Sequence, residues 1–163
     1  NDSRLIARQI CPMDMGIFAS PEYLSKFGRP TTATQYEQHS WVKYRFNQSG
    51  RVLSIQLPQA EQTVELNPES SILVDNGDAL AQLTCHGAGL AFMPHFLVRH
   101  LVKNGQLELI SPPWRNPEQA VYLYYLSRDY LPAKVRSFIE FIVEELEAQG
   151  ESAHTSWLQG KCN

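Results

Sequence analysis

The sequence predicts an α/β protein whose sheet contains parallel strands. The main observation is the stretch from Val74 to Pro94, where a strand end, a short helix and a second strand follow one another with few connecting residues. Ile72 to Val74 form an apolar run that stops at Asp75-Asn76-Gly77-Asp78, whose short polar side chains can accept the first N–H groups of a helix. This order is typical of a crossover between neighbouring parallel strands.

The candidate site lies at one edge of this sheet, because open α/β sheets bind ligands at the carboxyl ends of their strands. Asp75 to Asp78 follow the first strand, and Met93 to His95 follow the second. The free N–H groups at Asn76 to Asp78, with the positive end of the helix dipole, suit a carboxylate.

Local signals also predict the elements before this unit. A capping hydroxyl followed by a proline is typical of a helix start, and a glycine is typical of its end. The expected elements are strands at Leu5–Ile10 and Gly16–Ala19, separated by Cys-Pro-Met-Asp, a two-turn helix from Pro21 to Gly28, and a short helix capped by Thr31 or Thr32.

The middle of the chain predicts three strands. Trp41–Phe46 alternates and is rich in aromatic and β-branched residues, which places Lys43 and Arg45 on one face and Tyr44 and Phe46 on the other. Two further alternating runs flank a short polar turn and predict a hairpin at an antiparallel edge. These runs are Arg51–Leu57 and Gln62–Leu66.

The last third predicts two helices and two strands. Val121–Leu126 is continuously apolar, which favours a central strand buried on both faces. The final helix, opened by Pro132, needs a partner for its apolar face. This apolar face consists of Val135, Phe138, Ile139, Ile142 and Leu146. The other expected elements are a helix with Pro94 in its first turn, ending at Asn104-Gly105, a strand at Leu107–Ile110 and a loop at Ser111–Pro117.

Composition places the chain among ordinary globular proteins. Its 163 residues suffice for one domain, and its net charge of −3 gives no general attraction to nucleic acid. Cys11, Cys85 and Cys162 are widely spaced, so neither a disulfide framework nor a zinc site is expected. No transmembrane stretch or signal peptide is recognisable, which predicts a cytoplasmic protein without membrane contact. The sequence offers no catalytic constellation, so we expect no enzyme activity, no cofactor and no metal.

Taken together, several phrases resemble the C-terminal effector-binding (regulatory) domain of the LysR-type transcriptional regulators, a bacterial family of ligand-responsive DNA-binding proteins. Each phrase is weak alone, but their order and spacing from about Leu5 to Leu146 are those of the family. The phrases are Ala19-Ser20-Pro21-Glu22-Tyr23-Leu24, Gly28-Arg29-Pro30, His39 before Trp41, Val74-Asp75-Asn76-Gly77-Asp78-Ala79-Leu80, Gly87-Ala88-Gly89-Leu90-Ala91-Phe92-Met93-Pro94, Gly105-Gln106-Leu107, and Leu131-Pro132-Ala133-Lys134-Val135-Arg136-Ser137-Phe138-Ile139.

The resemblance implies a type 2 periplasmic-binding-protein-like fold, with two α/β subdomains joined by two crossing strands and the effector between them. This chain would supply one subdomain, a mixed, mostly parallel sheet flanked by helices, and would be a truncated fragment. Dimerisation or a swapped contact could cover the apolar surfaces left without neighbours. Residues 1–9 would be a remnant of the first subdomain or crossing strand, 10–120 the second regulatory subdomain, 121–150 the return strand and C-terminal helix, and 151–163 a tail.

The resemblance also implies which residues face the effector. A lysine or arginine on the strand at Trp41–Phe46 could hold a carboxylate, whereas Asp75 and Asp78 bring negative charge to the same place. The expected ligand-binding residues are Lys43, Tyr44, Arg45, Phe46, Asn76, Gly77, Asp78, Pro94, His95 and Tyr125.

Structural roles stay open for several of these residues. Asn76 and Asp78 are equally suited to capping the helix, and a histidine such as His95 in a first helical turn is commonly structural. Tyr124 or Tyr125 could present a hydroxyl to the cleft, with at least one of them in the core. Cys85 is expected to be a small core residue, since redox sensing would require a lowered thiol pKa and a partner thiol.

The implied function is effector sensing and oligomerisation in a bacterial transcription regulator. The effector would be a small, anionic metabolite, and the assembly a dimer or tetramer. DNA would be contacted only through an absent N-terminal helix-turn-helix, and RNA polymerase is a further implied partner. The alternative is a solute-binding protein of the same fold, which would have a secretory leader upstream of Asn1.

Overall fold

The computed structural model describes residues 5–60, 62–69, 71–126 and 132–145. Contacts divide the chain into two units, one of residues 14–116 and the other of residues 1–13 with 117–163. Strands β1 (Leu5–Ala19) and β8 (Trp114–Leu126) contribute residues to both units and pair with each other. The chain therefore passes between the units along two paired strands.

The parallel part of the larger unit is centred on β2 (Trp41–Tyr44). One edge of β2 pairs in parallel with β5 (Ser71–Val74) along its whole length. At the other edge, Trp41 forms a parallel bridge to Leu90, and the Val42 N–H donates to the Leu90 carbonyl over 2.8 Å. Both edges of β2 are therefore hydrogen-bonded.

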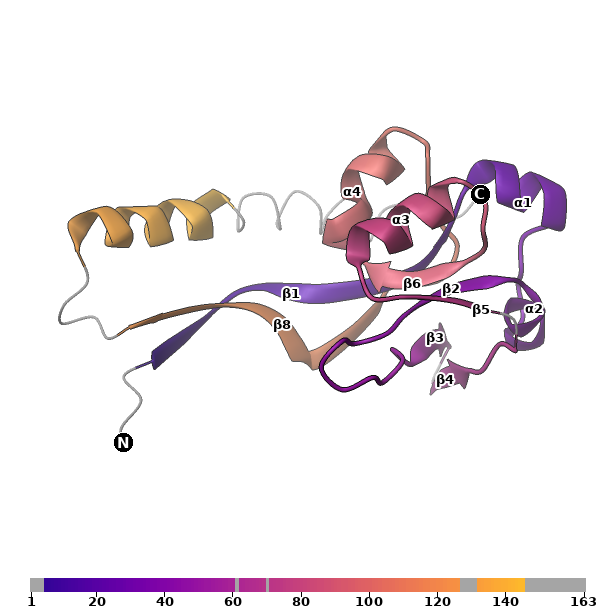
Figure 1. Ribbon diagram of the computed structural model, residues 1–163, viewed down its shortest axis with the longest axis horizontal. Helices are drawn as coiled ribbons and strands as arrows, with labels where there is room; N and C mark the ends of the chain where they lie inside the picture. The colour runs from indigo at the N-terminus through magenta and orange to yellow at the C-terminus, as the bar shows by residue number, and fades with distance from the viewer. Residues whose placement is uncertain (1–4, 61, 70, 127–131, 146–163) are drawn as a thin grey trace. The chain divides into compact units, whose positions relative to one another are not determined.

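The antiparallel part of this sheet continues from Leu90. Strand β6 (Ala91–Pro94) pairs antiparallel with β1, and β1 pairs antiparallel with β7 (Glu108–Leu109). With the bridge at Leu90, the strand order is β5-β2-β6-β1-β7. Figure 1 shows β6 beside β1 and β2 in this unit.

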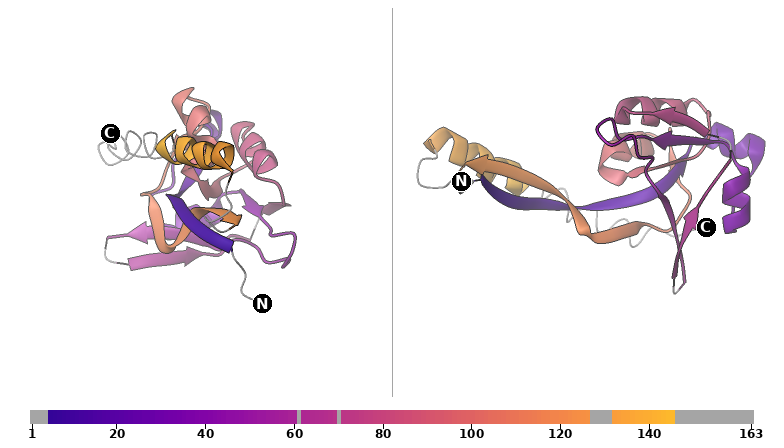
Figure 2. Two further views of the ribbon diagram at one scale, coloured as in Figure 1. Left: turned by 90° about the vertical axis from the view of Figure 1, so that its left-hand side faces the viewer. Right: turned by 60° about the horizontal axis from the view of Figure 1, so that its bottom comes forward.

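The helices begin at the caps that the sequence predicts. Ser20 Oγ accepts from the Tyr23 N–H, and Thr32 exchanges reciprocal hydrogen bonds with Gln35. Figures 1 and 2 show α3 and α4 on one side of the sheet. The four helices of this unit are α1 (Pro21–Phe27), α2 (Ala33–Gln38), α3 (Gly77–Cys85) and α4 (His95–Lys103).

A separate hairpin lies on the opposite side of the sheet from α3 and α4 (Figure 2). It consists of β3 (Ile55–Gln59) and β4 (Gln62–Leu66), which pair antiparallel as predicted. Its first strand begins four residues later than expected, and the two strands form their own sheet rather than an edge of the main one.

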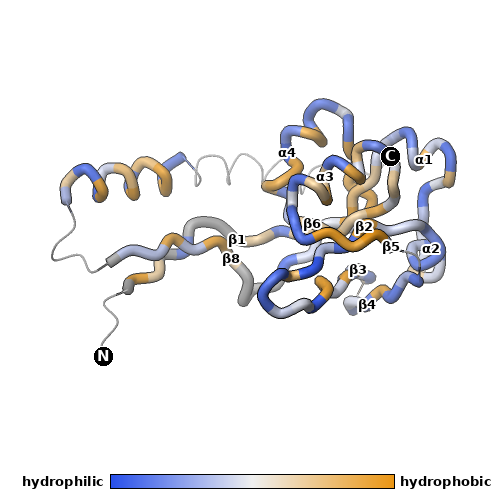
Figure 3. The backbone as a smooth tube through the Cα atoms, in the orientation of Figure 1, coloured by the Kyte–Doolittle hydropathy of each residue, from blue (hydrophilic) through white to orange (hydrophobic). Residues whose placement is uncertain are grey.

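The core of the larger unit gathers on the strands and on the inner faces of the helices. Trp41 is 1% exposed, and its indole N–H donates to the Tyr36 carbonyl over 2.8 Å, so its polar atom is satisfied. Figure 3 shows the apolar colouring of β5. The largest fully buried side chains include Trp41, Phe18, Ile17, Leu80, Leu90, Met93, Leu107, Val42 and Val98.

The smaller unit contains the helix over residues 133–145 in addition to parts of β1 and β8. Ile139 and Val143 are buried, whereas Phe138 and Phe141 are 59% and 57% exposed. The predicted apolar face is therefore only partly covered. Leu146, assigned to the same face, lies outside the described residues, as do the tail residues 151–163.

The crossover differs from the prediction in one respect. β5 and β6 run in the same direction, since each is parallel to β2, but they are not neighbours because β2 lies between them. Trp41 and Val42 of the central strand β2 are buried, whereas Ile72 and Leu73 of β5 are nearly half exposed. The apolar pattern of β5 resembles that of a buried strand, so local sequence does not reveal this order.

Two predictions on the crossing strands were wrong. The expected break at Cys-Pro-Met-Asp is absent, because β1 is continuous from Leu5 to Ala19; proline fits extended backbone and lacks only one donor. β8 begins at Trp114, inside the expected loop, and Tyr122 and Tyr124 are 41% and 61% exposed rather than buried on both faces.

A close backbone approach joins the start of β6 to β2. Gly89 has φ +154°, and a Cβ built on it would lie 2.4 Å from the Ser40 carbonyl oxygen. The next residue, Leu90, donates its N–H to that same carbonyl over 2.8 Å. Only glycine allows this contact without displacing the backbone.

Gly89→Ala should therefore lower the free energy of unfolding by about 3 kcal/mol, the sum of an unfavourable φ and a backbone clash. The matched control is Gly105→Ala, where φ is +70° but nothing lies within 4 Å of the added Cβ, so a loss of about 1 kcal/mol is expected. Urea unfolding measures both. Equal losses in the two variants would contradict the close approach.

Candidate functional site

The candidate site is the rim at which β2, β5 and β6 end. Because these strands are parallel, their carboxyl ends face the same edge of the sheet. Tyr44 lies opposite Val74 in the β2–β5 register, and the Arg45 N–H donates to the Val74 carbonyl over 2.7 Å. The predicted residues at the end of β2 therefore lie beside the start of the turn at Asp75.

The N-terminus of α3 follows this turn. Asn76 Oδ1 accepts from the Ala79 N–H over 2.9 Å, so the Asn76 side chain is a helix cap. Helix geometry leaves the N–H groups of Gly77 and Asp78 without an intrahelical acceptor. A Cβ on Gly77 would lie 3.3 Å from Leu97 of α4, so the first turns of α3 and α4 are close together.

The N-terminus of α4 adds a second set of backbone donors. Pro94 occupies the cap position just before the helix, not its first turn as predicted, and as the cap residue it makes no side-chain hydrogen bond to the helix start. His95 is the first helical residue, and its ring stacks on Phe18 with centroids 6.3 Å apart. Two helix starts therefore contribute to one rim.

His95 is neutral at pH 7. Burial lowers its pKa to about 4, and the positive charge of Arg99 acts in the same direction, whereas Asp14 acts in the opposite one. The stacking on Phe18 and the half-buried position fit the structural role left open for this histidine. As a neutral ring it can still donate one N–H.

An ion pair that was not predicted lies near His95. Arg115 Nε lies 2.5 Å from Asp14 Oδ1, and Arg115 Nη2 lies 2.7 Å from Asp14 Oδ2, a two-point contact between β8 and β1. The partners are 101 residues apart, and neither lies in a motif. No local signal could have identified them.

The remaining predicted residues lie in two places, four of them in or directly after β2 and one in β8. The Lys43 ammonium donates to the Pro68 carbonyl over 3.0 Å, so a backbone contact occupies it. Arg45 is exposed, and the Tyr44 and Phe46 rings meet edge to face with centroids 5.2 Å apart. Tyr125 is half-buried in β8 and belongs to the smaller unit.

The described residues contain no group of three His, Cys, Asp or Glu side chains placed to hold a metal ion. Burial raises the pKa of the Cys85 thiol, which opposes thiolate formation and fits a small packing residue. A pocket of about 480 Å³ does occur, but it is lined by α1, α2 and their connections rather than by any of the ten predicted residues.

Within the part of the chain that the structure describes, no helix combines the length and apolarity needed to cross a membrane.

Sequence comparison links the chain to transcriptional regulators. The model of the LysR substrate-binding domain matches residues 1–147. The chain is 28% identical over 143 residues to the HTH-type transcriptional activator AaeR of Escherichia coli K12, covering 88% of this chain and 46% of that protein. It is 29% identical over 147 residues to the HTH-type transcriptional regulator PtxR of Pseudomonas aeruginosa, covering 89% and 46%. The chain thus spans about half the length of these curated relatives.

Solved structures of regulatory domains are also similar to this chain. The regulatory domain of AphB from Vibrio vulnificus matches with a TM-score of 0.70 and 27% identity, over 89% of this chain and 71% of that one. The regulatory domain of CrgA from Neisseria meningitidis matches with a TM-score of 0.68 and 25% identity, over 90% and 71%. The predicted type 2 periplasmic-binding-protein-like fold is confirmed by these neighbours.

The depressed pKa of His95 predicts a pH-dependent stability. Between pH 6.5 and about 4 the unfolded chain binds a proton at His95 that the folded chain does not, so stability falls as the pH falls through this window. His95→Gln should reduce this loss in urea unfolding measured across the window. His100→Gln, an exposed histidine of the same helix, is the control. An unchanged pH dependence in His95→Gln would contradict the assignment.

Proposed function

The chain belongs to the LysR substrate-binding domain family, and we propose that it senses a small, anionic metabolite at the rim formed by β2, β5 and β6. The observation that carries this proposal is the convergence of two helix N-termini on the carboxyl ends of three parallel strands. Backbone N–H groups at helix starts favour negative charge, and carboxylates bind there readily.

The proposed contacts can be assigned residue by residue. The N–H groups of Gly77 and Asp78 would donate to one carboxylate oxygen, and the backbone N–H groups in the first turn of α4 would donate to the other. Arg45, exposed beside the turn, would add a guanidinium. Asn76 supports this arrangement by fixing the start of α3, since its own oxygen is already bonded.

The acidic residues at the rim should tune the affinity. Asp14 is paired with Arg115, so its charge is balanced within the chain. Asp78 lies in the first turn of α3 and would oppose an anionic ligand. We propose that this repulsion limits affinity for simple monocarboxylates, so that a preferred effector carries further groups that compensate for it.

We further propose that the domain contributes to oligomerisation. Among the described residues β5 pairs only with β2, so its outer edge is available, and Ile72 and Leu73 on it are 46% and 47% exposed. Apolar side chains on an unpaired strand edge favour association with another chain. The exposed rings of Phe138 and Phe141 form a second apolar surface, in the smaller unit.

In the proposed whole protein, effector binding would alter the arrangement of regulatory subdomains in the cytoplasm and so the DNA contacts of a helix-turn-helix outside this chain. The ligand acts only through different affinity for the two arrangements. Two relatives are an HTH-type transcriptional activator and an HTH-type transcriptional regulator, which supports this proposal. The gene sequence upstream of Asn1 tests it, because a helix-turn-helix supports it and a secretory leader supports a solute-binding protein instead.

Removing the opposing charge should strengthen ligand binding. Asp78→Asn in the full-length protein is expected to lower the Kd for a bound monocarboxylate about threefold, from the loss of repulsion at a helix end. Isothermal titration with the best of acetate, benzoate and pyruvate measures this. Glu22→Gln, an acid in the first turn of α1, is the control and should have no effect. Weaker binding in Asp78→Asn would argue against an anion at this rim.

A charge on the β5 edge should weaken association. Leu73→Glu is expected to shift the full-length protein toward smaller species, because it places a carboxylate on the apolar strand edge. Sedimentation velocity over a range of concentrations measures the distribution. Val52→Glu, at an apolar side chain 42% exposed elsewhere in the unit, is the control. The same distribution for wild type and Leu73→Glu would exclude this edge as an interface.

A further inference from the structure

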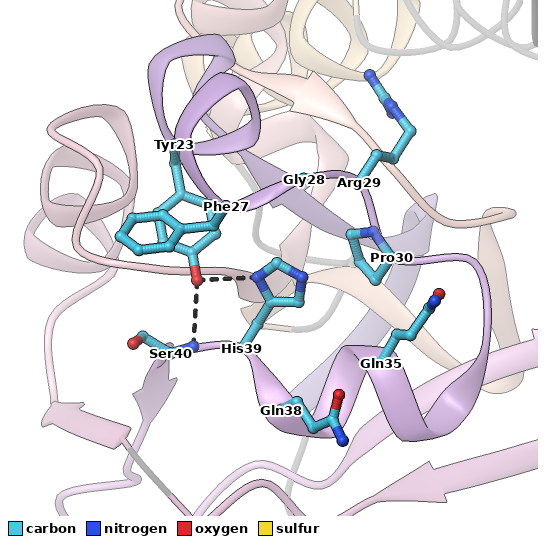
Figure 4. Close-up of a pocket in the computed structure, with 9 residues that line it drawn as sticks. All are labelled: Tyr23, Phe27, Gly28, Arg29, Pro30, Gln35, Gln38, His39 and Ser40. Carbon is cyan, nitrogen blue, oxygen red and sulfur yellow. Dashed lines mark hydrogen bonds between the residues drawn. The ribbon is translucent and has the colours of Figure 1, made fainter.

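A pocket in the larger unit lies outside the rim. Its volume is about 480 Å³, within the range of sites that bind small molecules. It is formed entirely by the segment from α1 to the start of β2. The lining residues are Tyr23, Phe27, Gly28, Arg29, Pro30, Gln35, Gln38, His39 and Ser40, shown in Figure 4.

The end of α1 and the start of α2 determine the shape of this pocket. α1 ends at Gly28, whose φ of +85° redirects the chain toward Pro30, and α2 begins at the Thr32 capping box. The two short helices are therefore held apart by a fixed connection of a few residues. The space between them is lined by side chains from both.

One wall of the pocket is aromatic. The Tyr23 and Phe27 rings lie 4.7 Å apart between centroids, and the Tyr23 and His39 rings lie 5.6 Å apart. Phe27 is 55% exposed although it is a large apolar side chain. A planar ring packed against this wall would cover apolar surface that is now in contact with water.

The hydrogen bonds of Tyr23 favour one tautomer of His39. The Ser40 N–H donates to the Tyr23 hydroxyl oxygen over 3.1 Å, the Ser40 side chain also interacts with this hydroxyl, and His39 Nδ1 lies 3.0 Å from it. Since the hydroxyl oxygen already accepts the Ser40 N–H, we assign the hydroxyl proton to the bond with His39 Nδ1. His39 then carries its proton on Nε2.

The protonated nitrogen of His39 faces the pocket. In Figure 4 the second ring nitrogen lies on the side of His39 toward Pro30 and Gln35. Burial lowers the pKa of His39, which keeps the ring neutral at pH 7. His39 thus places an uncharged N–H donor at the pocket.

Other polar groups of the pocket are mostly occupied. Gln35 Oε1 accepts from the Thr31 N–H, the Thr31 hydroxyl and the Thr32 N–H, so only its amide N–H groups are left to donate. The Arg29 guanidinium is paired with Glu108 and extends away from His39 in Figure 4. The Lys26 ammonium lies over the Phe27 ring, 5.2 Å from its centroid. The pocket offers donors without an unengaged charge.

We propose that this pocket is a second ligand site, independent of the rim, for an uncharged planar molecule that carries a hydrogen-bond acceptor, such as an aromatic amide or ester. The ring of the ligand packs against Tyr23 and Phe27, and its acceptor receives the N–H of His39 Nε2 and an N–H of Gln35.

Benzamide is the probe, and ¹H–¹⁵N NMR of the labelled chain is the measurement. Benzamide should cause saturable shifts in the α1 and α2 amides with a Kd of about 1 mM, as expected for a ligand of few atoms. Long-range imidazole spectra should show His39 protonated on Nε2 and shifted by benzamide. A His39 protonated on Nδ1, or no saturable shift in α1 and α2, would overturn the proposal.

A matched pair of variants tests the aromatic wall. Phe27→Ala should weaken benzamide binding at least tenfold, whereas Phe96→Ala, at a phenylalanine of the same 55% exposure on α4, should leave it unchanged. Because both rings are exposed, neither change should unfold the chain. Equal effects of the two variants would overturn the assignment.

Two further experiments distinguish this site from the rim. Asp78→Asn should not alter the benzamide shifts in α1 and α2. Benzoate, which has the same ring and a negative charge, should bind this pocket more weakly than benzamide. Tighter binding of benzoate here would exclude an uncharged ligand class.

Discussion

The structure depends on β2 having partners at both of its edges. β5 pairs along one edge, and the backbone of Leu90 bonds to the other through the Val42 N–H. Because all three strands run in parallel, their carboxyl ends coincide, and α3 and α4 begin beside one another at that edge. The rim therefore follows from strand order alone, before any side chain is considered.

Local features could be predicted from the sequence because their physics is local. The caps at Ser20, Thr32 and Asn76 each bond to an N–H three residues ahead, so their signals lie within a few positions. Strand neighbours cannot be read this way. The insertion of β2 between β5 and β6, and the exposure of Tyr122, depend on contacts between distant segments that no window of sequence contains.

The same division applies to the candidate site. Asn76 to Asp78 and His95 could be placed at the rim, since they follow strand ends. Whether Asn76 contacts a ligand or caps a helix could not be read from its identity, and the structure assigns its oxygen to the Ala79 N–H. The Asp14–Arg115 pair arises from tertiary packing, so the sequence offered no signal for it. The caps of α1 and α2 could be predicted, but not the pocket that their side chains line.

The backbone of Ser40 connects the pocket with the rim. Its N–H donates to the Tyr23 hydroxyl, which bonds to His39, and its carbonyl accepts from Leu90, where the chain enters β6 and leads to His95. Hydrogen bonds at Ser40 and the backbone of β6 therefore join one site to the other. Such a connection couples two ligands only if each binds two arrangements of it with different affinity. The backbone contact at Gly89 restrains those arrangements, because it leaves the Ser40 carbonyl little room to move.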